Sequence, residues 1–120
     1  MAASHGNVFV ITSRKEWDSK LFEANTNGKV VVVDFTATWC APCKFMAPIF
    51  AGLSEKHPEL IFVKVDVDDL SDIAKEYEVH AMPTFLFLKD GEQVERLVGA
   101  NKVELEKKAQ FFASQNVAVA

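Results

Sequence analysis

Long hydrophobic runs are absent from this sequence. Uninterrupted apolar stretches reach only four residues, as in Val30–Val33, whereas a helix that crosses a bilayer needs about 18 to 20. The first residues contain no basic segment followed by an apolar one and no Arg-rich stretch, and Ala2 stands where a myristoylated chain has glycine. We therefore expect no membrane partner and a cytoplasmic location.

Basic clusters are absent as well. The chain carries 13 Lys and Arg against 17 Asp and Glu, for a net charge of −4, and its basic runs do not exceed two residues, as in Lys107-Lys108. A negatively charged protein repels the phosphate backbone of nucleic acids. We therefore expect no nucleic-acid partner.

Cysteine is scarce: the 120-residue chain contains only Cys40 and Cys43. A disulfide-stapled scaffold is therefore excluded, and a bridge between these two would close too small a loop to stabilise the whole fold. A zinc site would need two further ligands, and the histidines at 5, 57 and 80 do not fit a compact finger. We expect no metal site and no catalytic part for these histidines. Buried inert thiols remain as a further alternative, but they would not need Pro42 at a loop-to-helix junction.

What is present indicates one globular domain with a single core, since 49% of the residues are hydrophobic and 25% are charged. Hydrophobic periodicity predicts strands over 8–11, 30–35 and 60–67, alternating with helices over 13–27, 43–57 and 70–77. Such alternation favours parallel strands with helices on both faces. Strands over 84–89 and 93–98 flank Asp90-Gly91, a type I′ hairpin signal, and Asn101 caps a last helix. The pattern predicts an α/β fold with a five-stranded mixed sheet and four helices.

The Cys40-Ala41-Pro42-Cys43 segment follows a predicted strand and begins a predicted helix. At a helix N-terminus, unpaired backbone N–H groups and the positive end of the dipole stabilise a thiolate. Cys40 is therefore predicted to be an exposed nucleophile. Cys43 lies one turn into the helix and faces inward, close enough to close a small ring with Cys40, so it is predicted to be the resolving thiol.

Asp34 interrupts the apolar strand over 30–35. A buried carboxylate without a partner is costly to ionise, so its pKa should be raised and it should exchange protons near neutral pH. The alternative is a residue at the strand end that is turned to solvent.

Three separated motifs carry a resemblance to a known family: Val32-Val33-Asp34-Phe35-Thr36-Ala37-Thr38-Trp39-Cys40-Ala41-Pro42-Cys43-Lys44, Met82-Pro83-Thr84 and Val98-Gly99-Ala100. On these motifs the chain resembles the thioredoxin family, most of all its cytosolic plant h-type members, over about residues 8–112. The resemblance implies a thioredoxin domain over 8–114, and we expect flexible ends over 1–7 and 115–120.

The same resemblance implies the function and partners. The chain would reduce protein disulfides, for example in peroxidases, through a reversible Cys40–Cys43 disulfide. It would bind no cofactor itself and would receive electrons from NADPH through a flavoprotein thioredoxin reductase. We expect a monomer, with a weak dimer through the apolar rim of the site as the alternative.

Several further site residues follow from the resemblance alone. The Met82–Pro83 peptide bond would be cis and face the dithiol, although a trans proline at a strand entrance would otherwise be the default. Asp34 would take the Cys43 proton through water, with Lys64 as its cationic partner, although Lys64 by itself suggests a lysine that reaches to solvent. The substrate-binding rim would comprise Trp39, Ala41, Ala81, Met82, Gly99 and Ala100.

Two other functions compete with this interpretation. A binding or chaperone module could use the same groove without turnover. The presence of both cysteines, Pro42, Asp34 and Pro83 argues against it. An isomerase or oxidant of the secretory pathway would usually carry Gly-His or Pro-His between its cysteines. Ala41 departs from the glycine that is usual in the family, and its higher helix propensity could shift the redox potential.

Overall fold

A five-stranded sheet lies at the centre of residues 5–116, the part of the chain that the structure, a computed structural model, describes. The strands, in the spatial order β1-β3-β2-β4-β5, are β1 (Phe9–Val10), β2 (Val31–Thr36), β3 (Ile61–Asp66), β4 (Thr84–Lys89) and β5 (Glu92–Val98). β3 pairs in parallel with β1 and β2, whereas β4 pairs antiparallel with β2 and β5. The predicted mixed sheet is confirmed, and its central strand β2 is buried along its whole length.

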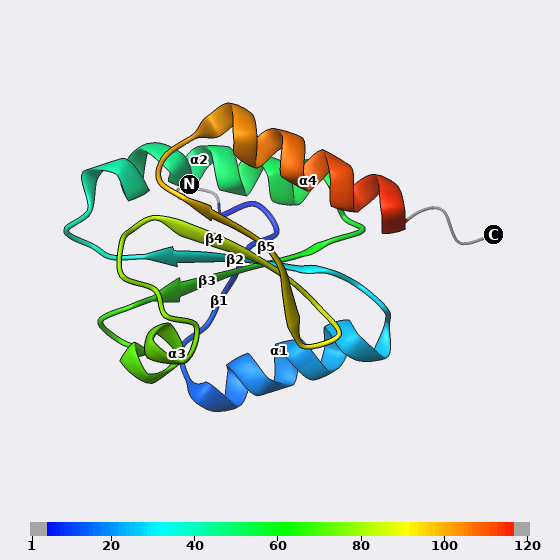
Figure 1. The fold of residues 1–120 in the computed structure, drawn as a ribbon, viewed down its shortest axis with the longest axis horizontal. Coiled ribbons are helices and arrows are strands. Elements are labelled where there is room, and N and C mark those ends of the chain that lie inside the picture. The colour runs from blue at the N-terminus through cyan, green and yellow to red at the C-terminus, as the bar shows by residue number, and fades with distance from the viewer. Residues whose placement is uncertain (1–4, 117–120) are drawn as a thin grey trace.

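Helices cover both faces of this sheet (Figure 1). They are α1 (Arg14–Thr26), α2 (Ala41–Lys56), α3 (Ser71–Glu76) and α4 (Lys102–Asn116). One core lies between the sheet and α1 with α3, and it includes Trp17, Ile73 and Val33. The other lies between the sheet and α2 with α4, and it includes Phe50 and Leu105. The four predicted helices and the two-sided packing are thereby confirmed.

Local signals set the ends of these elements. The Ser13 hydroxyl accepts a hydrogen bond from the Glu16 N–H at 3.1 Å, which caps α1, but the Glu16 carboxylate accepts from Thr12 and does not close a reciprocal capping box with Ser13. The Asn101 side chain likewise accepts from the Glu104 N–H at 3.1 Å. These caps satisfy backbone donors that have no partner inside their helices.

The first strand departs from the prediction. β1 spans two residues instead of four, and Phe9 is 38% exposed. The reason is that β1 is an edge strand, paired on one side with β3 only. Lys20 covers the outer face of the Phe9 ring at 4.3 Å.

The described residues extend past both ends of the predicted domain, residues 8–114, whose bounds stay a prediction. Residues 5–7 lie against α2, since the Asn7 N–H donates to the Ser54 hydroxyl at 2.8 Å, and α4 continues to Asn116. Residues 1–4 and 117–120 lie outside the described part, so the flexibility expected for the two ends stays a prediction.

Candidate active site

Cys40 is the N-cap residue of α2. Its backbone is extended, with φ −97° and ψ 107°, and its Sγ accepts a hydrogen bond from the Cys43 N–H at 3.2 Å. The two residues form a disulfide, with their Cα atoms 5.3 Å apart. Since its sulfur accepts the Cys43 N–H at the positive end of the helix dipole, a reduced Cys40 would lie where a thiolate is stabilised.

Both cysteines are buried in this disulfide form, each with only 4% of its surface exposed. They pack against Ala37, Val67 and Met82. The greater exposure expected of Cys40 is therefore not seen in the oxidised state. What distinguishes the two sulfurs is their position on α2, because only Cys40 occupies the capping site.

The loop between α3 and β4 contacts the disulfide. The Met82–Pro83 peptide bond is cis, as expected, and the Met82 carbonyl oxygen lies 3.6 Å from Cys40 Sγ. The Gly99 N–H donates to the Pro83 carbonyl at 2.8 Å, and the Thr84 hydroxyl donates to the Ala81 carbonyl at 2.6 Å. The Met82 carbonyl thus places this loop beside Cys40, and the other two bonds tie Pro83 to Gly99 and Ala81 to Thr84.

Trp39 precedes Cys40 in the chain, and 66% of its surface is exposed. Its indole N–H donates to the Asp68 carboxylate at 2.9 Å, and the turn that carries Asp68 is held by the Asp66 carboxylate, which accepts from the Asp68 N–H at 2.8 Å. Asp68 was not identified from the sequence. Its signal is weak, since acidic residues after a strand are also typical of a solvated turn.

Asp34 lies on β2 beneath α2, with only 2% of its surface exposed. Burial raises the pKa of Asp34 to about 7, against a smaller lowering by the positive charge of Lys64. Its Oδ1 atom is buried without a hydrogen-bond partner. The alternative of a residue turned to solvent is therefore wrong.

Lys64 is the register partner of Asp34 on β3. Since Val32 and Phe62, two positions earlier on the same strands, both pack in the α2 and α4 core, Asp34 and Lys64 lie on that face of the sheet. The Lys64 side chain is half-buried. The positive charge of Lys64 favours the ionised form of Asp34, which lowers the pKa of that carboxyl.

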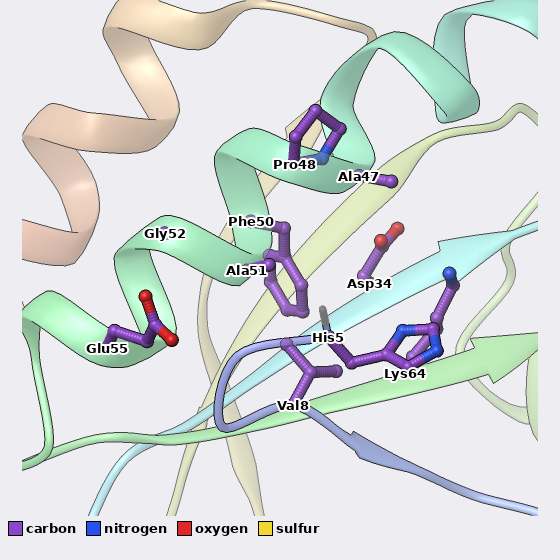
Figure 2. A pocket seen from close by; sticks show the side chains of 10 residues that line it. All are labelled: His5, Val8, Asp34, Ala47, Pro48, Phe50, Ala51, Gly52, Glu55 and Lys64. Carbon is purple, nitrogen blue, oxygen red and sulfur yellow. The ribbon is translucent and has the colours of Figure 1, made fainter. Parts of the chain in front are cut away.

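Two cavities that share part of their lining lie beside this pair and beside Cys43. A cavity of about 460 Å³ is lined by Asp34, Lys64 and residues of α2 (Figure 2). A second, of about 430 Å³, is lined by Cys43, Lys64 and Thr36. His5, Ala47 and Lys64 line both cavities. Each is large enough for several water molecules.

The described residues offer no cluster of three or more His, Cys, Asp or Glu side chains suited to a metal ion. No helix within residues 5–116 combines the length and apolar character needed to cross a membrane.

The fold and the site agree with a single family, whose model, thioredoxin, matches residues 8–110. The chain belongs to the thioredoxin family. Thioredoxin H9 of Arabidopsis thaliana is 57% identical over 105 residues, which are 88% of this chain and 75% of that protein. The structure of a poplar thioredoxin h mutant superposes with a TM-score of 0.90 at 45% identity, over 100% of this chain and 91% of that one.

A third similar chain comes from a structural study of the thiol resolving mechanism in yeast mitochondrial 1-Cys peroxiredoxin via glutathione and thioredoxin systems. It is 39% identical, with a TM-score of 0.78, over 91% of this chain and 99% of that one. As a thioredoxin family member, the chain is a protein-disulfide oxidoreductase, and Cys40 and Cys43 are its redox-active pair.

Proposed function

We propose that the protein reduces target disulfides with Cys40 as the nucleophile and Cys43 as the resolving thiol. The carrying observation is the position of Cys40 Sγ at the N-cap of α2, where it accepts the Cys43 N–H. The Cys40 thiolate attacks one target sulfur, and the other leaves as a thiolate. Deprotonated Cys43 then attacks Cys40 Sγ, which forms the intramolecular disulfide and releases the second target thiolate. The target gains two electrons, and the Cys40–Cys43 pair loses them.

Asp34 is proposed to accept the Cys43 proton through water in the second step. A carboxyl group with a pKa near 7 can take and return a proton at neutral pH. The adjoining cavities beside Asp34 and Cys43 support this route. Lys64 is proposed to stabilise the ionised carboxylate, because its charge favours that form.

The apolar rim is proposed to hold the target segment. Trp39, Ala41, Ala81 and Ala100 are exposed, and Met82 and Gly99 are half-buried, so an extended peptide has room beside the sulfurs. The Met82 backbone would pair with that segment. Pro42 lies in the first turn of α2, where a missing N–H costs no helical hydrogen bond, and Pro83 would fix the opposing loop.

The likeness to plant H-type thioredoxins supports a proposed electron supply from NADPH through a flavoprotein thioredoxin reductase, within the cytoplasm. Peroxidases with a disulfide intermediate are proposed as targets, in line with the peroxiredoxin study that contains a related chain. The protein is proposed to act as a monomer, because a dimer through the rim would cover the groove.

A trapping experiment tests the assignment of the two cysteines. Cys43→Ser should accumulate mixed disulfides with target proteins, because Cys40 still attacks and the fast intramolecular displacement is missing. Cys40→Ser is the matched control and should trap almost none. Adducts are compared by non-reducing and reducing electrophoresis after incubation with oxidised peroxidase.

A binding module without exchange chemistry would give no reductant-sensitive adducts with either variant. That outcome would contradict the proposed exchange mechanism. Turnover of the unchanged protein with NADPH and thioredoxin reductase would, in the same preparation, test the electron supply separately.

A further inference from the structure

The segment that precedes β1 is anchored to α2 at Ser54. The Asn7 N–H donates to the Ser54 hydroxyl at 2.8 Å, and the Asn7 side-chain amide donates to the Ser54 carbonyl at 3.4 Å. The Val8 N–H donates to the His5 carbonyl at 3.0 Å, which closes a turn. This turn lies before residue 8, where the match to the family model begins.

Gly6 is the residue that permits this close approach. Its φ is +57°, a backbone conformation that favours glycine. A Cβ atom at this position would collide with the Ala51 carbonyl and the Ser54 hydroxyl on α2. Gly28 has a similar φ of +66°, but a Cβ there would meet nothing within 4 Å. Replacing either glycine with a larger residue would therefore strain the backbone. Only at Gly6 would the added Cβ atom also collide with a neighbour.

The anchored turn holds His5 at the wall shared by the two cavities. The imidazole lines the Asp34 cavity and the Cys43 cavity, as Lys64 does. In Figure 2, Asp34 lies between α2 and the side chains of His5 and Lys64. His5 and Lys64 are thus the titratable side chains that line both the cavity beside Cys43 and the cavity beside Asp34.

The other charged groups around these cavities are less suited to passing a proton on. They are Asp34 and Glu55 in the first cavity, Lys44, Asp66 and Asp69 in the second, and Lys64 in both. Apart from Asp34, these are carboxylate and ammonium groups. Imidazole differs from them because it has two nitrogens and can accept a proton on one while it releases a proton from the other.

We propose that His5 carries the proton between Asp34 and solvent during the resolving step, a role that rests on the proposed function of Asp34. Cys43 Sγ–H gives its proton through water to the Asp34 carboxylate, and the Asp34 carboxyl passes a proton to one nitrogen of His5 while the other nitrogen releases one to water. The Cys43 sulfur, kept as a thiolate because its proton has left, then attacks Cys40. No electron moves in this transfer. Because His5 acts through Asp34 and touches no reacting sulfur, it is a positioning residue.

The test separates the two steps of exchange. The reduced protein is mixed in stopped flow with an excess of 5,5′-dithiobis(2-nitrobenzoate), whose released thiolate is coloured. The first phase reports attack by Cys40, and the second reports displacement by Cys43. His5→Ala should leave the first phase unchanged and slow the second about three- to tenfold. Added imidazole should restore the second phase, since it fits the vacated site.

Matched variants distinguish a role of His5 in proton transfer from a role in filling space. His5→Gln keeps a polar side chain of similar size and should stay slow, because an amide does not exchange protons near neutral pH. Gly6→Ala should slow the second phase by displacing His5, whereas Gly28→Ala should not. A second phase at the wild-type rate in His5→Ala or Gly6→Ala, or a slowing that imidazole does not relieve, overturns the proposal.

The dependence on Asp34 is tested separately. Asp34→Asn should slow the second phase, and His5→Ala added to that variant should cause no further slowing, because the proton that His5 carries comes from Asp34. Further slowing by the same factor would mean that His5 acts independently, which overturns the proposal and leaves the role of Asp34 intact. An unchanged second phase in Asp34→Asn would overturn the proposed role of Asp34 and, with it, that of His5.

Discussion

The two faces of the sheet differ at equivalent positions of the same strands. On the face covered by α1 and α3, Val33 and Val65 are fully buried among apolar neighbours. On the face covered by α2 and α4, the adjacent positions Asp34 and Lys64 border a cavity of about 460 Å³. One face of β2 and β3 is therefore packed with apolar side chains throughout, whereas the other carries two charged side chains and a cavity close to the redox-active pair.

Taken alone, the burial of Asp34 lowers the stability of the folded state. A buried carboxylate loses its hydration and, at Oδ1, gains no hydrogen bond in return. The opposite face can offset such a cost, because it buries large side chains, Trp17 among them, without polar interruption at these positions. One face of β2 and β3 thus contributes mainly to the stability of the fold, and the opposite face carries the side chains proposed to act in the reaction.

The largest expected effect on stability is in the α1 and α3 core. Trp17→Ala should lower the free energy of unfolding by about 3 to 5 kcal/mol, because it leaves a cavity where the indole packs against Tyr77. Chemical denaturation followed by circular dichroism measures the loss. Under native conditions the rate of the resolving step should be unchanged, and a slower step would show that the two faces are not separate in function.

A pH-dependent effect is expected on the other face, at Asp34. Its pKa is about 7 in the folded protein against an ordinary 3.8, so between these values the folded state keeps a proton that the unfolded state releases. The stability of the wild type should therefore fall as pH rises from about 4 to about 7 and level off above. Asp34→Asn removes this titration, so its stability relative to the wild type should rise across the same window, by up to the order of 4 kcal/mol.

Denaturation curves at several pH values, for the wild type and Asp34→Asn, check this. A difference that stays constant from pH 4 to 8 would show that Asp34 does not carry the titration. The unpaired amide of asparagine costs the same at every pH, so it does not affect the slope.

The smallest effect is expected at Ala41, the first residue of α2. Ala41→Gly makes the helical conformation less favourable by up to about 1 kcal/mol. If this cost destabilises only one of the dithiol and disulfide forms, the redox potential shifts by about 20 mV. Gly52→Ala on the same helix, where an added Cβ meets nothing within 4 Å, is the control and should leave the potential unchanged. Equilibration with a glutathione redox buffer measures both, and equal potentials for Ala41→Gly and the wild type would mean that the departure at Ala41 is neutral.

Much of the fold could be predicted because its signals are local. The Asp90-Gly91 turn has positive φ at both residues, as the dipeptide indicated, and alternating strands and helices favoured the parallel pairs that the sheet contains. β1 was overestimated because hydrophobicity alone does not distinguish an edge strand from a central one. The buried position of Asp34 could be inferred because its neighbours along the chain are all apolar.

The helices and strands, the disulfide-forming pair and the position of that pair at a helix start could be predicted from the sequence alone. Each of these features depends on residues that lie a few positions apart. Only the tertiary structure decided which distant side chains meet: the Trp39 indole with Asp68, 29 residues on, the Met82 carbonyl with Cys40, 42 residues apart, and His5 with both cavities. The physical reason is that such contacts depend on strand order and on how helices pack on the sheet, which the whole core decides together.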